Sequence, residues 1–271
     1  MATRELLPSG SLGIAVAVDG TERETAAVYE DLGYDTLWIA GGQLDRLERV
    51  TELVGATRTV RVATGVAPLG VYGVDQLAAL HHSLPPGRLV LGLGAPQRPR
   101  ALAALNAALD GLDAAGVPAG QRLLAALGPR KIALARDRTA GAITLLVTPE
   151  STAATRTVLG PGPLLVVHQY VAVGGPRASA REAVRRPLSF LASVPGYRAS
   201  FERMGFGPDD VDALSDRLVD TLAVVGDEHD VAERMAAHRA AGADQVVVSV
   251  LPVPDGPSAT EVAAAIAALA A

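Results

Sequence analysis

Short apolar segments alternate with longer amphipathic segments along almost the whole chain. The apolar segments are rich in Val, Ile and Leu, and such near-continuous runs are typical of parallel strands that are buried on both faces. The pattern therefore predicts eight buried strands, at residues 12–18, 36–40, 60–67, 89–93, 122–127, 142–147, 164–173 and 245–251.

The amphipathic segments predict a helix after each strand. Two of them begin with the hydroxyl-to-carboxylate spacing of a capping box, in Thr21-Glu22-Arg23-Glu24 and Ser258-Ala259-Thr260-Glu261. Two others have a proline in the first turn, at Pro129 and Pro149. We predict helices over 21–32, 45–57, 74–84, 98–115, 129–138 and 227–241, with further helices beginning at 148 and 258.

Eight strands that each precede a helix, in a chain of 271 residues, favour the α/β class and a closed (β/α)8 TIM barrel. A doubly wound open sheet is the alternative. Residues 176–225 contain at least two helical stretches, one of which opens at Gly207-Pro208-Asp209-Asp210. We therefore expect a helical insertion after the seventh strand. No shift in composition marks a linker, so we expect a single domain over residues 1–271.

Composition excludes several classes of function. The net charge of −5 argues against a nucleic-acid binder, and 3% aromatic residues argue against a ring-stacking platform. The chain has no cysteine, which excludes disulfides and thiolate metal sites, and no histidines and acids show metal-ligand spacing. No apolar run approaches 18 residues, and the first ten lack the layout of a signal peptide. We expect a cytoplasmic protein with no membrane partner and no metal.

In a TIM barrel the candidate functional residues lie where the strands end. The fifth strand leads into Gly128-Pro129-Arg130-Lys131, which contains the only lysine of the chain. Free N–H groups and two cations at a helix start suit a phosphate or carboxylate group, although a Gly-Pro pair is also an ordinary helix start. The fourth strand ends in Gly92-Leu93-Gly94, which lacks the third glycine of a dinucleotide fingerprint. The third strand exits through Thr64-Gly65-Val66-Ala67-Pro68, where the glycine suggests a bulge or an unusual peptide bond, although a plain strand end is the default.

Histidines are few. His168 and Gln169 are adjacent within the seventh strand, so one of them points into the barrel and the other toward the helices. For His168 we favour a hydrogen-bonded core histidine over a catalytic one. The remaining four histidines are expected on the surface: His81, His82, His229 and His238.

Several blocks, taken in order, are similar to a known family. The chain resembles the luciferase-like monooxygenase superfamily, in the branch of actinobacterial oxidoreductases that use the deazaflavin coenzyme F-420. The blocks are Leu32-Gly33-Tyr34-Asp35-Thr36-Leu37-Trp38-Ile39, Val62-Ala63-Thr64-Gly65-Val66, Gly87-Arg88-Leu89-Val90-Leu91-Gly92-Leu93-Gly94, Ala126-Leu127-Gly128-Pro129-Arg130, Ala140-Gly141-Ala142, Leu159-Gly160-Pro161-Gly162-Pro163-Leu164-Leu165, Tyr197-Arg198, Met204-Gly205-Phe206, Ser215-Asp216-Arg217-Leu218-Val219-Asp220 and Ala241-Gly242-Ala243-Asp244.

The resemblance implies a flavin-type ring in the barrel mouth, a non-proline cis peptide bond at Gly65–Val66, and a homodimer. F-420 is the expected cofactor, FMN the second choice, and the absence of any cofactor a third possibility. On this reading Gly65, Val66, Gly92 and Gly94 face the ring, and Gly128, Pro129, Arg130 and Lys131 hold phosphate. Candidate catalytic residues on the substrate side are His168, Tyr197, Arg198 and Arg217.

Three loops depart from the family pattern. Ala40-Gly41-Gly42 replaces a Pro-Glu pair after the second strand, and Gly73-Val74-Asp75 replaces Arg-Asp-Pro beyond the third. Ala95-Pro96-Gln97 replaces a histidine after the fourth. Three hypotheses follow. The first is a deazaflavin- or flavin-dependent oxidoreductase that acts on a small organic molecule. The second is a barrel without cofactor that performs a non-redox step on a hydrophobic metabolite, with His168 or Tyr170 as acid or base, and the third is a non-catalytic binding subunit. The first is preferred because Gly128-Pro129-Arg130-Lys131 is intact.

Overall fold

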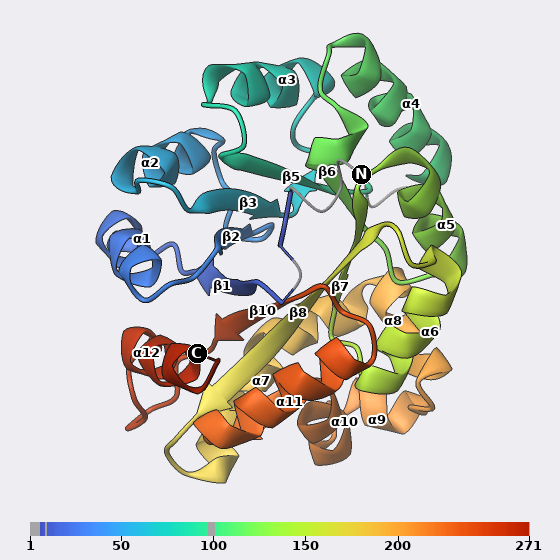
Figure 1. Ribbon diagram of the computed structural model, residues 1–271. Coiled ribbons are helices and arrows are strands. Elements are labelled where there is room, and N and C mark those ends of the chain that lie inside the picture. Colours follow the sequence, from blue (N-terminus) through green and yellow to red (C-terminus); the bar gives the residue numbers. More distant parts are fainter. Residues whose placement is uncertain (1–5, 9, 97–100, 271) are drawn as a thin grey trace.

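The computed structural model describes residues 6–8, 10–96 and 101–270, and Figure 1 shows a ring of strands surrounded by helices. Eight parallel strands pair side by side, and the last of them pairs again with the first, so the sheet closes. In ring order they are β1 (Leu12–Val16), β2 (Thr36–Ala40), β3 (Arg61–Gly65), β5 (Leu89–Gly94), β6 (Arg122–Ala125), β7 (Gly141–Leu145), β8 (Leu164–Val173) and β10 (Gln245–Val250). The predicted (β/α)8 TIM barrel is confirmed.

Helices cover the outside of the ring. They are α1 (Glu22–Asp31), α2 (Glu48–Ala56), α3 (Val74–Ser83), α4 (Ala101–Ala114), α5 (Pro129–Arg138), α6 (Pro149–Leu159), α11 (Glu228–Ala240) and α12 (Ala259–Ala270). The helix predicted from Arg98 is therefore described from Ala101 onward, because residues 97–100 lie outside the described residues.

Capping was predicted correctly at one helix and wrongly at another. Before α12 the Ser258 hydroxyl and the Glu261 carboxylate form the expected reciprocal bonds, with Ser258 N–H donating to Glu261 Oε2 at 2.8 Å. Before α1 the Thr21 side chain caps no helical N–H and instead donates to Asp19 Oδ1 at 2.7 Å. The competing carboxylate two residues upstream is the physical reason for this difference.

The third strand ends as the resemblance implied. The Gly65–Val66 peptide bond is cis, and the two-residue strand β4 (Ala67–Pro68) then continues the pairing with β5. Small residues surround this turn: a Cβ on Gly41 would lie 2.6 Å from the Val66 carbonyl oxygen, and a Cβ on Gly94 would lie 2.5 Å from Val66 Cγ2. The loops after β2 and β5 can therefore pack directly on Val66 only because they carry glycine there.

Side chains alternate between the two faces of the barrel wall. Outward residues such as Ile14, Leu37 and Val62 pack in the cluster that includes the covering helices, whereas inward residues fill a separate interior cluster. The interior cluster contains Leu6, Leu7, Trp38, Ala63, Val90, Leu123, Ile143, Leu164, Val166 and Val247. The barrel is thus a packed core rather than a channel.

The insertion lies between β8 and β10. It contains α7 (Arg177–Ser193), α8 (Pro195–Arg203), α9 (Pro208–Asp212), α10 (Asp216–Leu222) and the short strand β9 (Val224–Gly226), which pairs with the last residues of β8. Figure 1 shows α8, α9 and α10 together on one side of the barrel. Their apolar cluster includes Ala172 and Leu146, and Leu145 and Tyr170 pack against it. The insertion therefore rests on the carboxyl-end parts of β7 and β8.

Among the described residues, no helix combines the length and the hydropathy that a membrane span needs.

Candidate active site at the carboxyl ends of the strands

Seven inward-facing residues near the carboxyl ends of the strands are only half-buried. By alternation with the interior cluster they point into the barrel, and they are Ala15, Ala40, Gly65, Ala125, Leu145, Tyr170 and Ser249. We call these seven residues the mouth. The inward residues beneath them, among them Trp38, Ala63 and Leu123, are buried. The mouth is therefore partly accessible to solvent, and a packed floor closes it below.

The mouth has two chemically different sides. The strands from β1 to β6 contribute only Ala and Gly: Ala15, Ala40, Gly65 and Ala125. The two strands that close the ring, β8 and β10, contribute Tyr170 and Ser249, which occupy paired register positions. One side therefore offers small apolar groups and backbone, and the other offers two hydroxyl groups.

His168 belongs to the floor. Its ring meets the ring of Trp38 edge-on, with centroids 4.8 Å apart, and a Cβ on Gly65 would lie 3.0 Å from His168 Cε1. Nε2 is buried and has no hydrogen-bond partner among the described residues. The expectation of a fully hydrogen-bonded core histidine is therefore wrong, because this nitrogen faces apolar neighbours. Burial lowers the pKa of His168 to about 3, so the ring is neutral at pH 7.

Gln169 points the other way, toward the helices, as alternation predicted for one of the pair. Its amide nitrogen donates to the Leu222 carbonyl at 2.9 Å, which leaves Oε1 to accept from His238 Nε2 at 3.1 Å. His238 Nδ1 then accepts from the Thr152 hydroxyl at 2.9 Å. This chain of hydrogen bonds connects β8 with α6, α10 and α11.

The surface placement expected for His238 is wrong. His238 is completely buried on the inner face of α11. Burial, together with the nearby Arg234, lowers its pKa to about 4. A single histidine on a helix carries no periodic signal, so the sequence did not distinguish this position from His229, which is exposed. Its partners lie 69 and 86 residues away along the chain.

Tyr197 lies beside the mouth. It is part of α8 and packs, like Tyr170, against the apolar cluster of the insertion, with its ring 6.2 Å from that of Phe201. Burial raises the pKa of Tyr197, and the nearby Tyr170 raises it further. Burial also raises the pKa of Tyr170 to about 12. Tyr197, one of the candidates on the substrate side, therefore lies near Tyr170 on the β8 side of the mouth.

The two arginine candidates are bound within the insertion. Arg198 pairs with Asp212, and Arg217 pairs with Asp210 at 2.5 Å while its guanidinium lies 4.7 Å above the ring of Phe206. Both acidic partners belong to α9, whereas Arg198 lies in α8 and Arg217 in α10. These contacts give both arginines a structural role in the insertion.

The segment Gly128-Pro129-Arg130-Lys131 forms the start of α5. Gly128 is the N-cap and Pro129 the first helical residue. Arg130 is exposed and Lys131 half-buried, and neither side chain bonds to a residue that the structure describes. Partial burial lowers the pKa of Lys131. An ammonium group held in this way lacks the counter-charge that partly buried cations normally have.

A further cation reaches the same place from the insertion. Arg203, at the end of α8, donates through Nη2 to the Leu127 carbonyl at 2.9 Å. Arg203 carries no signal of this contact in the sequence, because Arg203 and Leu127 are 76 residues apart in the chain. Three basic residues therefore lie around the loop between β6 and α5.

The four ring-side candidates fall into two groups. Gly65 and Val66 are half-buried at the mouth, whereas Gly92 and Gly94 are buried. A Cβ on Gly92 would lie 2.0 Å from the Thr64 carbonyl oxygen. Gly92 and Gly94 thus let β5 approach β3 closely. The neighbouring Gln97, singled out in the loop after β5, lies outside the described residues.

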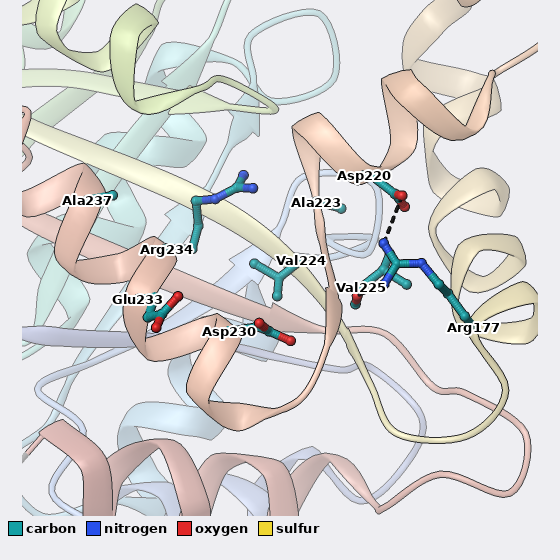
Figure 2. A pocket seen from close by; sticks show the side chains of 9 residues that line it. All are labelled: Arg177, Asp220, Ala223, Val224, Val225, Asp230, Glu233, Arg234 and Ala237. Atoms are coloured by element: carbon teal, nitrogen blue, oxygen red, sulfur yellow. Dashed lines mark hydrogen bonds and ion pairs between the residues drawn. The ribbon is translucent and has the colours of Figure 1, made fainter.

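A separate pocket of about 400 Å³ lies away from the mouth (Figure 2). Its lining comes from α7, α10, β9 and α11: Arg177, Asp220, Ala223, Val224, Val225, Asp230, Glu233, Arg234 and Ala237. Figure 2 shows Arg177 and Asp220 facing each other, and Asp220 also pairs with Arg181. Two of its five charged lining residues, Arg177 and Asp220, therefore already neutralise each other.

Comparisons with known proteins identify the fold. No family model and no curated protein matches the chain. Among solved structures, the coenzyme F-420-dependent tetrahydromethanopterin reductase of Methanopyrus kandleri superposes with a TM-score of 0.75 at 15% identity, over 95% of this chain and 97% of the reductase.

Two further solved structures agree. An F-420-dependent secondary alcohol dehydrogenase, in complex with an F-420-acetone adduct, gives 0.75 at 12% identity over 96% and 97% of the two chains. The oxygenating constituent of 3,6-diketocamphane monooxygenase from Pseudomonas putida, in complex with FMN, gives 0.70 at 14% identity over 96% and 97%. The resemblance found in the sequence is thus confirmed at the level of the fold.

Proposed function

We propose that this chain, whose fold is shared with F-420-dependent reductases and FMN-dependent monooxygenases, is an oxidoreductase that transfers a hydride between F-420, or alternatively FMN, and a small organic substrate. The observation that carries the proposal is the mouth itself. Small half-buried residues surround it on one side, above a packed floor that holds an unpartnered histidine nitrogen.

The mouth fits a flat ring. Ala15, Ala40 and Gly65 leave space that larger side chains would fill, and they offer no charge that would repel a conjugated system. His168 Nε2 is a buried nitrogen with no partner in the part of the chain that the structure describes, and such a group gains a hydrogen bond when a polar ligand atom approaches it.

The start of α5 fits the phosphate of such a cofactor. Lys131 is half-buried and unpaired among the described residues, Arg130 is exposed beside it, and Gly128 keeps the N-cap free of a side chain. Free N–H groups at a helix start and two cations attract a phosphate strongly.

The residues of the chain have distinct tasks in this mechanism. Lys131 and Arg130 would hold the phosphate, and Gly65 and Val66 would present backbone and one aliphatic side chain to the ring. The insertion packs its apolar cluster against Leu145 and Tyr170 and so limits, without closing, solvent access on the β8 side of the mouth. A bound deazaflavin or flavin supplies the two-electron chemistry that protein side chains lack.

A binding experiment tests the proposal directly. Trp38, the only tryptophan, is buried in the floor next to His168, so its fluorescence reports on ligands in the mouth. We expect F-420 or FMN, titrated at tens of micromolar, to change the Trp38 emission and to raise the melting temperature. If neither cofactor binds in this range, the proposal fails, and a non-redox barrel becomes the better reading.

Variants of the phosphate side provide the second test. We expect Lys131→Ala and Arg130→Ala each to weaken cofactor binding by about 1–3 kcal/mol, because each removes a charge-assisted contact. Arg136→Ala is the matched control, since Arg136 is exposed in the last turn of the same helix and pairs with Asp137. Equal affinities for all three variants would remove Lys131 and Arg130 from the binding site.

A further inference from the structure

Tyr170, a candidate acid or base in the sequence, is joined at the mouth by a second hydroxyl-bearing residue, Ser249, which carries no signal in the sequence. They occupy directly paired positions of β8 and β10. Tyr170 shares its inward face with Val166 and His168, and Ser249 shares its inward face with Val247. Neighbouring strands lie about 4.8 Å apart, so the two side chains leave the barrel wall next to each other.

Both hydroxyl groups are free to bind a ligand. Neither donates to or accepts from any residue that the structure describes. Neither oxygen is among the buried side-chain atoms without a partner, so both oxygens reach solvent-accessible space although both residues are half-buried. Hydroxyl groups in such a recess are satisfied by water or by a bound molecule.

The surroundings define what that molecule can be. The other strands bring only apolar residues to the mouth: Ala15 next to Ser249, then Ala40, Gly65 and Ala125 farther round the ring, and Leu145 on the β7 side of Tyr170. No charged side chain belongs to the mouth as defined above. A charged substrate would lose its hydration there without a counter-charge, whereas an apolar molecule with one oxygen atom can place that oxygen on the two hydroxyls.

We propose that Tyr170 and Ser249 together bind the carbonyl oxygen of a small apolar ketone or aldehyde, and that Tyr170 is the catalytic proton donor for its reduction. This inference rests on the proposed function, because it assumes the reduced deazaflavin or flavin as the two-electron reductant.

The carbonyl carbon gains a hydride as a C–H bond of the reduced cofactor breaks, so a new C–H bond forms on the substrate and the cofactor is oxidised by two electrons. The π pair of the C=O bond moves to oxygen, which takes the proton of the Tyr170 hydroxyl, so the product is an alcohol. The Ser249 O–H donates a hydrogen bond to the oxygen as negative charge develops. The Tyr170 phenolate regains its proton from solvent at the open mouth.

Tyr170 carries its proton at neutral pH, as an ordinary tyrosine does, and burial raises its pKa further, to about 12. The alkoxide oxygen that forms on the reduced carbonyl is more basic than a phenolate, so the proton passes from Tyr170 to that oxygen.

Infrared spectroscopy tests the pair without any cofactor. Carbon-13-labelled cyclohexanone bound to the protein is expected to show a carbonyl stretch below its frequency in an apolar solvent such as hexane, because two donors polarise the bond. Tyr170→Phe and Ser249→Ala should each move the band to higher frequency. Tyr29→Phe, which removes a phenolic hydroxyl from the buried face of α1, should leave it unchanged.

Kinetics test the proton transfer. In the cofactor-loaded protein, Tyr170→Phe should lower kcat for cyclohexanone reduction by about 10²–10⁴-fold with a smaller change in KM. Ser249→Ala should raise KM and lower kcat less. Circular dichroism and Trp38 emission verify that each variant is folded.

The outcomes separate the two proposals. If no cofactor binds, the proposed function fails, and the infrared result alone decides whether the hydroxyl pair holds a carbonyl. If the cofactor binds but Tyr170→Phe retains full kcat, or if the infrared band is the same in wild type, Tyr170→Phe and Ser249→Ala, the inference is overturned. A wild-type protein that shows no bound band overturns it as well.

Discussion

At the scale of single residues, one carboxylate shows how the loops beneath the barrel are held. Glu30, at the end of α1, accepts hydrogen bonds from the backbone N–H groups of Arg58, Thr59 and Val60, at 2.8, 2.6 and 2.8 Å. Burial by itself would raise the pKa of Glu30, but these bonds and the charge of Arg58 outweigh it and lower the pKa to about 2. The ionised carboxylate thus satisfies three donors that precede β3.

Replacing this carboxylate weakens the fold. We expect Glu30→Gln to lower the free energy of unfolding by about 1–3 kcal/mol, because an amide satisfies fewer of the three donors and brings no charge. Urea denaturation followed by Trp38 fluorescence measures the effect. Glu24→Gln, at an exposed position of the same helix, is the control. If the two variants were equally stable, the loop contacts of Glu30 would carry no net stabilisation.

At the scale of secondary-structure elements, the distance between β3 and β5 is set by glycine. The Thr64 hydroxyl donates to the Gly92 carbonyl at 2.7 Å, and a Cβ on Gly92 would also lie 2.8 Å from Ile143 Cδ1. No ordinary Cβ contact is as short as the 2.0 Å to the Thr64 carbonyl oxygen, so any side chain here must push the two strands apart. Gly92 therefore supports the floor beneath Gly65.

The same substitution is expected to have opposite effects at two glycines. Gly92→Ala should destabilise the protein by about 1–3 kcal/mol, because it overpacks the contact between β3 and β5. Gly55→Ala, in helix α2 with open space around the added methyl group, should stabilise it by about 0.4–1 kcal/mol. Thermal unfolding of both variants checks this contrast, and a tolerated Gly92→Ala would show that the strands can separate at little cost.

At the scale of the whole molecule, two buried neutral histidines link stability to pH. The pKa values of His168 and His238 are lowered by burial to about 3 and about 4, whereas an unfolded histidine titrates near 6.5. Below pH 6.5 the unfolded chain therefore binds protons that the folded chain does not. The stabilisation is complete above the unfolded pKa and is lost as the pH falls toward the folded values.

This linkage gives a quantitative expectation. Between pH 6 and pH 5 each of the two histidines should lower the free energy of unfolding by up to about 1.4 kcal/mol per pH unit. His238→Gln should reduce that slope by the share of one histidine, while His229→Gln, at an exposed position, should leave it unchanged. Urea titrations at several pH values measure the slope. Parallel curves for wild type and His238→Gln would contradict the assignment.

Much of the architecture was predictable because it depends on local pattern. Strands buried on both faces require continuous apolar runs, and all eight predicted strands are present, with β1, β3, β6 and β7 each ending two residues earlier than predicted and β10 one residue earlier. The helix starts at Pro129, Pro149 and Ser258 follow from rules that concern four neighbouring residues. The resemblance also located the cis peptide bond at Gly65–Val66 correctly.

The candidate site was less predictable, because it depends on which distant residues meet. His168 was identified from the sequence, but not the apolar contacts with Trp38 and Gly65 that leave its nitrogen unpartnered. Arg198 and Arg217 were chosen as candidates, yet their carboxylate partners lie 14 and 7 residues away and hold them within the insertion.

Local pattern therefore defined the elements and their order, because a strand or a helix start depends on residues close together in the chain. Closure of the barrel decided the chemistry. The register of β8 and β10 places Tyr170 beside Ser249, and the packing of α11 buries His238 against Gln169. Such contacts join residues that are 69 or more positions apart, and their burial and pairing follow from the folded packing rather than from any local preference of the chain.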